Sequence, residues 1–433
     1  MILIYTTHIT RRITYISKFL FTSILGVPVN LTSNRDEFGQ YEGPKINYSE
    51  ENFDTITIQP HTLLFENDIR MFTPVVAWFK EVPVLFPSAG SSAMPFDPFA
   101  AAFFMVTRYE EYWPQPTDRH GRVLTEKSVA FQHGFLEIPV VDHWALALQQ
   151  LIEKHYPAYL FPKREYNFTP TIDIDIAYAY LYRSIWRIAG ATAKSIVKGN
   201  MTDIDHRIQV LLRHKTDPYD TFPLLLALHR QYDLDPIFFF QVGKYGQYDK
   251  NISPSHPAMQ KLIRQIQAEH KIGIHPSYQS NSNTDQLRDE ITTLENIIAK
   301  PVSRSRQHFL ILQFPSTYQN LISCGITEDY TMGYSSHTGF RAGTCTPFYF
   351  YDLSTEKETA LVVYPFQVMD GTLNQYLKLS PLEAIERINR LNTEVRKVNG
   401  TFISLWHNES LSEMREWSGW REVYSALNSI ASK

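Results

Sequence analysis

Residues 166–433 alternate short apolar runs with longer stretches of helical periodicity. The short runs predict strands, and the longer stretches predict helices. The predicted strands cover 168–174, 236–242, 271–275, 307–312, 339–342, 361–368 and 401–406. The predicted helices cover 220–232, 256–270, 284–299, 316–324, 381–398 and 419–432. This alternation predicts parallel strands with covering helices, either as a (β/α) barrel or as a doubly wound sheet.

The first 165 residues have a less regular pattern. Strand-like runs at 2–5, 55–58 and 82–86 are mixed with turn signals, and helical periodicity covers 97–112 and 142–156. The polar segment 163–165 then resembles a hinge. Because 433 residues are too many for one small core, we expect two domains. These are a mixed α/β domain of unknown role at 1–165 and a (β/α) domain at 166–433.

Two further stretches have helical patterns. Segment 16–25 superficially resembles a signal peptide, but Lys18 interrupts its apolar run and no small-x-small cleavage site follows before Pro28. A first amphipathic helix is expected there instead. Segment 177–217 is basic, apolar and long, and we interpret it as an inserted helical excursion. No other stretch reaches the roughly 18 apolar residues of a membrane span.

Composition narrows the classes of function. Lys+Arg 41 against Asp+Glu 45 gives a formal net charge of -4, without long runs of either sign, which argues against nucleic acid as a partner. The two cysteines, Cys324 and Cys345, are too few for a disulfide framework and predict unpaired thiols in a reducing compartment. We therefore expect a cytoplasmic protein, and we leave open a peripheral membrane contact and the oligomeric state.

The first strand of the C-terminal part carries two carboxylates. Ile172, Ile174 and Ile176 alternate with Asp173 and Asp175, so a strand would turn both aspartates to one face. Like charges this close raise each other's pKa unless a cation or a basic group lies between them. The pair therefore points to a metal, a polar ligand or acid–base chemistry. In the structural alternative, Asp173 caps a turn and Asp175 begins a helix.

Polar residues also lie at or near the ends of other predicted strands. In a parallel barrel these ends converge on one face, where active sites are built. The residues concerned are Asp173, Asp175, His275, Arg306, His308, Arg341, Asp370 and His407. Their common placement predicts a single site.

Three of these residues form a candidate metal site. Asp175, His275 and His308 offer one carboxylate and two imidazoles, a set suited to zinc and other transition metals. The structural alternatives are a surface position for His308 and a turn role for His275, which precedes Pro276. An imidazole that ends an Ile-Gly-Ile strand favours the metal for His275.

Another group predicts proton transfer. His407 follows Trp406, which commits its strand to the core, and would pair with Asp173 as acid and base on opposite sides of a substrate. Asp370 would hydrogen-bond an imidazole and hold its tautomer or its charge. Arg341 has the alternative of bracing a loop, and the glycines beside it are not a phosphate fingerprint because no helix is predicted to follow.

The ordered set resembles the polysaccharide deacetylase family, which is carbohydrate esterase family four with the NodB-homology domain. The sequence TIDID at 171–175 is similar to the first motif of the family, in which the first Asp is the general base and the later Asp binds the metal. HPSY at 275–278 is similar to the second motif, which contributes a metal-binding histidine. RQH at 306–308, or alternatively FRAG at 340–343, stands where the arginine motif belongs.

The resemblance continues to residue 433. PFQVMD at 365–370 falls where the acidic fourth motif belongs, and LWH at 405–407 resembles the final motif with its general-acid histidine. Two departures are clear: Gln279 stands where the second motif has another histidine, and Ile174 separates aspartates that are adjacent in the family. We therefore expect His308 to replace the missing ligand.

The resemblance implies a distorted (β/α) barrel that acts as a metal-dependent deacetylase, with zinc as the expected metal and an additional N-terminal domain. Its substrate would carry N- or O-acetyl groups on a surface glycan or a glycan precursor. The expected catalytic residues are Asp173, His407, Asp370, Arg341 and Arg306. One alternative is a catalytically silent barrel that binds a glycan or a partner protein. Another is a glycosidase that pairs Asp173 with Asp370 and needs no metal, which requires carboxyl groups roughly 5–9.5 Å apart.

Overall fold

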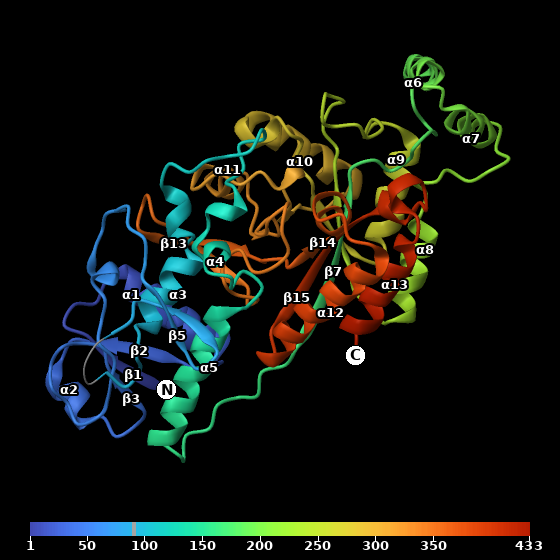
Figure 1. Ribbon diagram of the computed structural model, residues 1–433. Helices are drawn as coiled ribbons and strands as arrows, with labels where there is room; N and C mark the ends of the chain where they lie inside the picture. The colour runs from blue at the N-terminus through green and yellow to red at the C-terminus, as the bar shows by residue number, and fades with distance from the viewer. Residues whose placement is uncertain (89–91) are drawn as a thin grey trace.

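The computed structural model describes residues 1–88 and 92–433 (Figure 1). The C-terminal part is built on a nine-stranded sheet with the order β12-β13-β11-β10-β9-β8-β7-β15-β14. Its strands are β7 (Asn167–Ile174), β8 (Ile237–Phe240), β9 (Lys271–Ile274), β10 (Arg304–Ser305), β11 (Glu328–Asp329), β12 (Phe348–Asp352), β13 (Lys357–Val363), β14 (Val368–Met369) and β15 (Thr401–His407). Neighbouring strands are parallel except β12 and β13. The predicted parallel α/β architecture is therefore confirmed.

Helices connect and cover the strands. They are α6 (Ile185–Val197), α7 (Met201–Leu211), α8 (Phe222–Gln231), α9 (Pro257–Gln267), α10 (Thr284–Ile298), α11 (Ser316–Ser323), α12 (Pro381–Lys397) and α13 (Trp420–Ala431). α9 and α10 pack on β9, α11 on β13 and α12 on β15. Helix α12 starts sharply because Ser380 and Glu383 form a capping box and Pro381 occupies the first turn.

Two predicted strands are wrong. In 307–312 the chain turns, since Phe309 and Leu310 have φ of 58° and 54°, a region that no strand uses. In 339–342 the chain is irregular: Gly339 has φ of 126°, and a Cβ there would lie 2.4 Å from the carbonyl oxygen of Leu136. The predicted strand 361–368 is in fact the end of β13, a short loop and the start of β14.

The expected closure of the barrel is not seen. The ladder runs from β12 at one edge to β14 at the other. Within residues 1–88 and 92–433 no ladder joins these two edge strands. The described residues therefore form an open, mostly parallel sheet.

The N-terminal part has its own parallel sheet, with the order β2-β1-β3-β4, and a separate antiparallel pair, β5 and β6. The strands are β1 (Ile2–Tyr5), β2 (Val29–Thr32), β3 (Lys45–Asn47), β4 (Ile56–Thr57), β5 (Val76–Phe79) and β6 (Val82–Leu85). The helices are α1 (Arg11–Lys18), α2 (Arg35–Gln40), α3 (Pro98–Val106), α4 (Val129–Gln132) and α5 (Val140–His155). The amphipathic helix expected at 16–25 begins earlier, as α1, and continues as a π-helix over Phe19–Ile24.

The apolar core continues from the N-terminal part into the C-terminal part. Every residue of α3 is buried, and its Phe103 meets Tyr351 of β12 with ring centroids 5.4 Å apart. The domain boundary at residue 165 therefore stays a prediction. No helix in the described part of the chain is long and apolar enough to cross a membrane.

The segment 177–217 contains the predicted helical excursion. It forms α6 and α7, which stand away from the rest of the molecule in Figure 1. Both ends of the excursion return to the sheet region, between β7 and α8. This insertion begins shortly after β7, which carries Asp173 and is followed by Asp175.

Candidate metal centre and catalytic pocket

The register of the sheet brings the predicted site residues to one edge. His407 is the last residue of β15 and pairs with Asp173 of β7 in the ladder. Asp175 follows β7, His275 follows β9 and Arg306 follows β10. Because these strands are parallel, their carboxyl ends meet at the same edge, as the sequence predicted.

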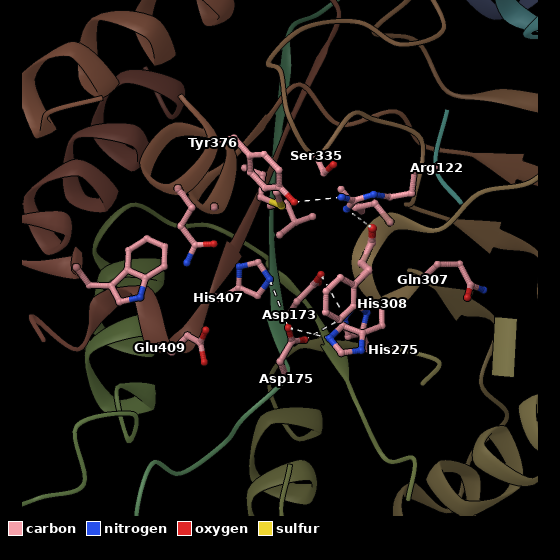
Figure 2. Close-up of a pocket in the computed structure, with 17 residues that line it drawn as sticks. Arg122, Asp173, Asp175, His275, Gln307, His308, Ser335, Tyr376, His407 and Glu409 are labelled. Atoms are coloured by element: carbon pink, nitrogen blue, oxygen red, sulfur yellow. Dashed lines mark hydrogen bonds and ion pairs between the residues drawn. The ribbon is translucent and has the colours of Figure 1, made fainter. Parts of the chain in front are cut away.

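The three predicted metal ligands lie together. Nε2 of His275 is 3.0 Å from Oδ1 of Asp175, and Nε2 of His308 is 3.3 Å from Oδ2 of the same carboxylate. One ligand atom from each residue can be chosen so that all three lie within 4.8 Å of one another. Figure 2 shows these side chains converging from different segments. His308 thus lies beside the other two ligands rather than on the outer surface.

Both imidazoles are oriented by hydrogen bonds from Nδ1, on the side of the ring away from Asp175. Nδ1 of His275 is 2.6 Å from the carbonyl oxygen of Arg306, and Nδ1 of His308 is 2.8 Å from Oδ1 of Asp249. Since Nδ1 donates in each ring, Nε2 of the neutral imidazole keeps a lone pair that faces Asp175. Oδ1 of Asp175 is buried and accepts no hydrogen bond. Lone pairs that face each other need a cation or a proton between them, so this donor set fits a divalent metal.

The charge balance supports the same assignment. Burial raises the pKa of Asp175, but His308 and His275 outweigh burial and hold that pKa well below its usual range. Burial lowers the pKa of His308, but the carboxylates of Asp175 and Asp249 outweigh it and raise this pKa to about 9. The cluster therefore attracts positive charge. A bound divalent ion would supply that charge and displace the protons.

Asp173 lies beside this cluster and is held by an arginine. Nη1 of Arg306 donates to Oδ1 of Asp173 at 3.1 Å and to Oγ1 of Thr171 at 2.6 Å. Its Nε donates to the carbonyl oxygen of Tyr330 at 2.9 Å. The other carboxylate oxygen, Oδ2 of Asp173, is 3.8 Å from Nε2 of His275. Arg306 does not line the cavity, so its contact with the site is through Asp173.

His407 approaches from the neighbouring strand. Its Nδ1 is 2.7 Å from Oδ1 of Asp370, and its backbone N–H donates to Oδ2 at 2.8 Å. Nε2 of His407 points toward the carboxylate of Asp175, 3.8 Å from Oδ2. Burial lowers the pKa of His407, but Asp370, and then Asp175 and Asp173, raise it well above its ordinary value. The imidazole therefore holds its proton at neutral pH.

A cavity of about 200 Å³ is lined by Asp173, Asp175, His275, His308 and His407. One lining residue, Arg122, comes from the N-terminal part, which the sequence did not indicate. Arg122 donates to the carbonyl oxygen of Phe309 at 2.8 Å and to the hydroxyl of Tyr376 at 3.1 Å. Figure 2 shows the Arg122–Tyr376 contact across the cavity from Asp175. The N-terminal part therefore helps to shape the pocket.

Glu409 is a further carboxyl group in the cavity that was not predicted. Burial raises its pKa to about 7, although His407 opposes the shift, and its Oε2 is buried without a hydrogen-bond partner. Asp249 was also missed. Glu409 could have been found from its place two residues after His407, at the end of a buried strand. Asp249 lies in a loop after β8 with no nearby motif.

Two other predicted site residues, Arg341 and Asp370, lie outside the cavity. The guanidinium of Arg341 donates hydrogen bonds to Glu111 of the N-terminal part, with Nε 3.1 Å from Oε1, and to the carbonyl oxygen of Gly333 at 3.0 Å. Asp370 contacts Nδ1 of His407 on the side away from the cavity. Gln279 is exposed, so the place of a second-motif histidine is not used and His308 provides the third side chain.

Comparison with protein families gives one match. Residues 2–157 match a family described as "Family of unknown function (DUF7033)". No curated protein matches the chain. The match covers the N-terminal part and leaves the residues of the metal cluster outside it.

Solved structures resemble the chain only distantly. A protein assigned as a polysaccharide deacetylase from Mycobacterium smegmatis has 17% identity and a TM-score of 0.39, covering 63% of this chain and 87% of its own. A CE4 family pseudoenzyme from Bacillus anthracis has 11% identity and a TM-score of 0.29, covering 60% and 61%. A GH57 branching enzyme from Thermococcus kodakaraensis has 9% identity and a TM-score of 0.33, covering 61% and 68%. Scores this low carry no argument about activity, which has to be argued from the residues of this chain.

Proposed function

We propose that the protein is a metal-dependent deacetylase that hydrolyses N- or O-acetyl groups on a surface glycan or a glycan precursor. One observation carries this proposal: Asp173 and His407 flank the Asp175–His275–His308 cluster in one cavity. A base, an acid and a metal ligand set within one small pocket are what hydrolysis of an acyl group requires. The motifs described from the sequence support the same assignment, including a NodB-type fold.

Asp175, His275 and His308 would hold the metal, for which zinc suits the one carboxylate and two imidazoles. When bound, the ion would polarise the acetyl carbonyl and lower the pKa of a water molecule. Asp249 and the carbonyl oxygen of Arg306 keep the two Nε2 atoms directed at it.

The remaining residues move and hold protons. Asp173 takes a proton from the attacking water through Oδ2, while Arg306 keeps Oδ1 in place. His407 gives its Nε2 proton to the departing nitrogen or oxygen. Asp370 accepts from Nδ1 and stabilises the charged imidazole until that transfer. A change of 10²–10⁴-fold in rate, roughly, is expected for each lost acid or base.

The glycosidase alternative is disfavoured by the surroundings of Asp370. Its carboxylate already accepts from Nδ1 and the backbone N–H of His407 and from the backbone N–H of Gly371. Such a carboxylate is not free to attack a sugar or activate water. A silent glycan-binding protein remains the alternative. The expected cytoplasmic location belongs to this proposal, and the free thiols of Cys324 and Cys345 are consistent with it.

The proposal is tested with two isosteric variants loaded with zinc by the same protocol. Asp175→Asn should lower zinc occupancy, because a neutral amide is a weaker partner for a divalent ion than a carboxylate. Asp173→Asn should keep zinc bound and lose about 10²–10⁴-fold in deacetylation rate. Acetate release from an acetylated oligosaccharide measures the rate, and metal analysis measures occupancy.

Asp205→Asn, an exposed position on α7, is the matched control and should change neither quantity. Full deacetylation by both site variants would contradict the mechanism. A parent protein that binds zinc but releases no acetate from any acetylated glycan would make binding the better account.

A further inference from the structure

A second cavity, of about 430 Å³, lies between the helical excursion and the segment 414–417. Trp417 lines both this cavity and the candidate catalytic pocket, so the two are neighbours. Six basic side chains and only two acidic ones, Asp203 and Glu416, line it; the basic residues are Arg183, Arg187, Lys194, Lys198, Arg207 and Arg415. The whole chain has a formal charge of -4. Positive charge is therefore concentrated here against the overall balance.

Two of the arginines are already paired. Asp203 accepts from Nη2 of Arg207 at 2.7 Å and from Nη2 of Arg415 at 3.0 Å. The same carboxylate also accepts from the hydroxyls of Tyr180 and Ser195. Asp203 is thus fully used by groups that surround it. It cannot neutralise the remaining four cations.

Those four cations have no carboxylate partner among the ion pairs of residues 1–88 and 92–433. Nε of Arg183 is buried without a hydrogen-bond partner. Asp217 is the acidic group with the strongest electrostatic effect on Arg183, and its carboxylate oxygens accept hydrogen bonds from backbone N–H groups. The guanidinium of Arg187 lies 3.5 Å from the centre of the Tyr245 ring. Lys194 of α6 and Lys198, which directly follows this helix, border the same space.

Arg183 and Arg187 are half-buried without a carboxylate partner, which is costly, so the cavity favours an anionic ligand. Its volume exceeds that of the catalytic pocket, and several cations around one space suit a group with more than one negative charge. We propose that this cavity binds the phosphate or pyrophosphate of a phosphorylated glycan whose acetylated sugar occupies the neighbouring pocket. The glycan part of this statement rests on the proposed function, whereas phosphate binding does not.

The outer side of α6 favours a phosphate carried by a lipid. Ile185, Trp186, Ile196 and Val197 are 81%, 87%, 60% and 87% exposed. At 3.6 residues per turn they share one side of the helix, within an arc of about 120°. The lysines and Arg187 of the cavity lie on another side. An apolar stripe beside a cationic edge is the pattern of helices that lie on anionic lipid surfaces.

Titration of the parent protein with inorganic pyrophosphate, followed by calorimetry, tests the cavity directly. Lys194→Gln combined with Lys198→Gln should weaken pyrophosphate binding by about tenfold or more, because two charge-assisted contacts are lost. Lys215→Gln, which lies outside the cavity lining, is the control and should bind as the parent does. Both lysines of the double variant are exposed, so the fold is expected to persist. A parent that does not bind pyrophosphate, or a double variant that binds it equally well, overturns the proposal.

Two further arms separate the sources of phosphate and the two proposals. Sedimentation with phosphatidylglycerol vesicles that is weakened both by the double lysine variant and by Trp186→Ser assigns a lipid-borne phosphate. Pyrophosphate binding without vesicle binding assigns a soluble one. Vesicle binding that only Trp186→Ser weakens overturns the proposal in favour of a simple membrane contact. Asp173→Asn should bind pyrophosphate as the parent does, so loss of deacetylation and loss of this cavity's function are measured independently.

Discussion

Asp249 offers a graded test of how the metal centre is held. Its Oδ1 accepts from Nδ1 of His308 at 2.8 Å and from the backbone N–H of Tyr278 at 3.0 Å. This oxygen fixes the tautomer that leaves Nε2 of His308 for the metal. We predict that Asp249→Ala lowers zinc affinity by about 10–100-fold, the usual effect of losing such a partner. Asp249→Asn should lose less, because its amide oxygen can replace Oδ1 although the charge is gone.

Stability should change in the same order. In Asp249→Ala the buried Nδ1–H of His308 loses its acceptor, at a cost of about 1–3 kcal/mol, and the half-buried backbone N–H of Tyr278 loses its acceptor as well. Zinc affinity is measured by competition with a chromophoric chelator, and unfolding is followed by urea denaturation of the metal-free proteins. Asp205→Ala, exposed on α7, is the control. Zinc binding by Asp249→Ala as tight as that of the parent would refute the role of Asp249 in orienting His308.

Two other predictions concern groups outside the pocket. Glu111→Gln breaks the buried ion pairs with Arg108 and Arg341. The unfolding free energy measured in urea should therefore fall by about 3–5 kcal/mol, while zinc affinity is retained. An unchanged urea midpoint would contradict this. Burial, with His270 adding to it, lowers the pKa of His229 from 6.5 to about 3. The unfolded chain then binds a proton that the folded chain refuses, so stability should fall as pH falls across this window, by up to about 1.4 kcal/mol per pH unit. His229→Gln should flatten the pH dependence of urea unfolding, and an unaltered slope would count against the assignment.

Much of the fold could be predicted because buried parallel strands are continuous apolar runs. The strand predicted at 2–5 matches β1, and β7, β9 and β15 lie within one residue of their predicted bounds. The error at 307–312 has a physical origin. Leu310, Ile311 and Leu312 are buried as an apolar run should be, but burial does not determine the backbone conformation. Here the chain turns so that the ring of His308 can reach Asp249 and Asp175.

The metal ligands could be predicted for a related reason. Asp175 and His275 directly follow apolar strands, and a parallel sheet brings such ends together whatever the loops between them do. Asp249 and Arg122 could not be predicted in this way. Both lie in loops, where no periodicity restricts the direction of a side chain. Their roles depend on contacts across long sequence separations, Asp249 with His308 and Arg122 with Tyr376.

The two candidate arginines show what only the structure can decide. Arg306 and Arg341 each matched the arginine motif, and each forms a buried ion pair with a carboxylate. The partner of Arg306 is Asp173, so this arginine acts on the site. The partner of Arg341 is Glu111, so this arginine ties the segment after β11 to the N-terminal part. Arg122 of that part also donates to the carbonyl oxygen of Phe309, the residue after His308. The residues before 165 are therefore structural components of the pocket. Its shape depends on contacts that no motif in 166–433 encodes.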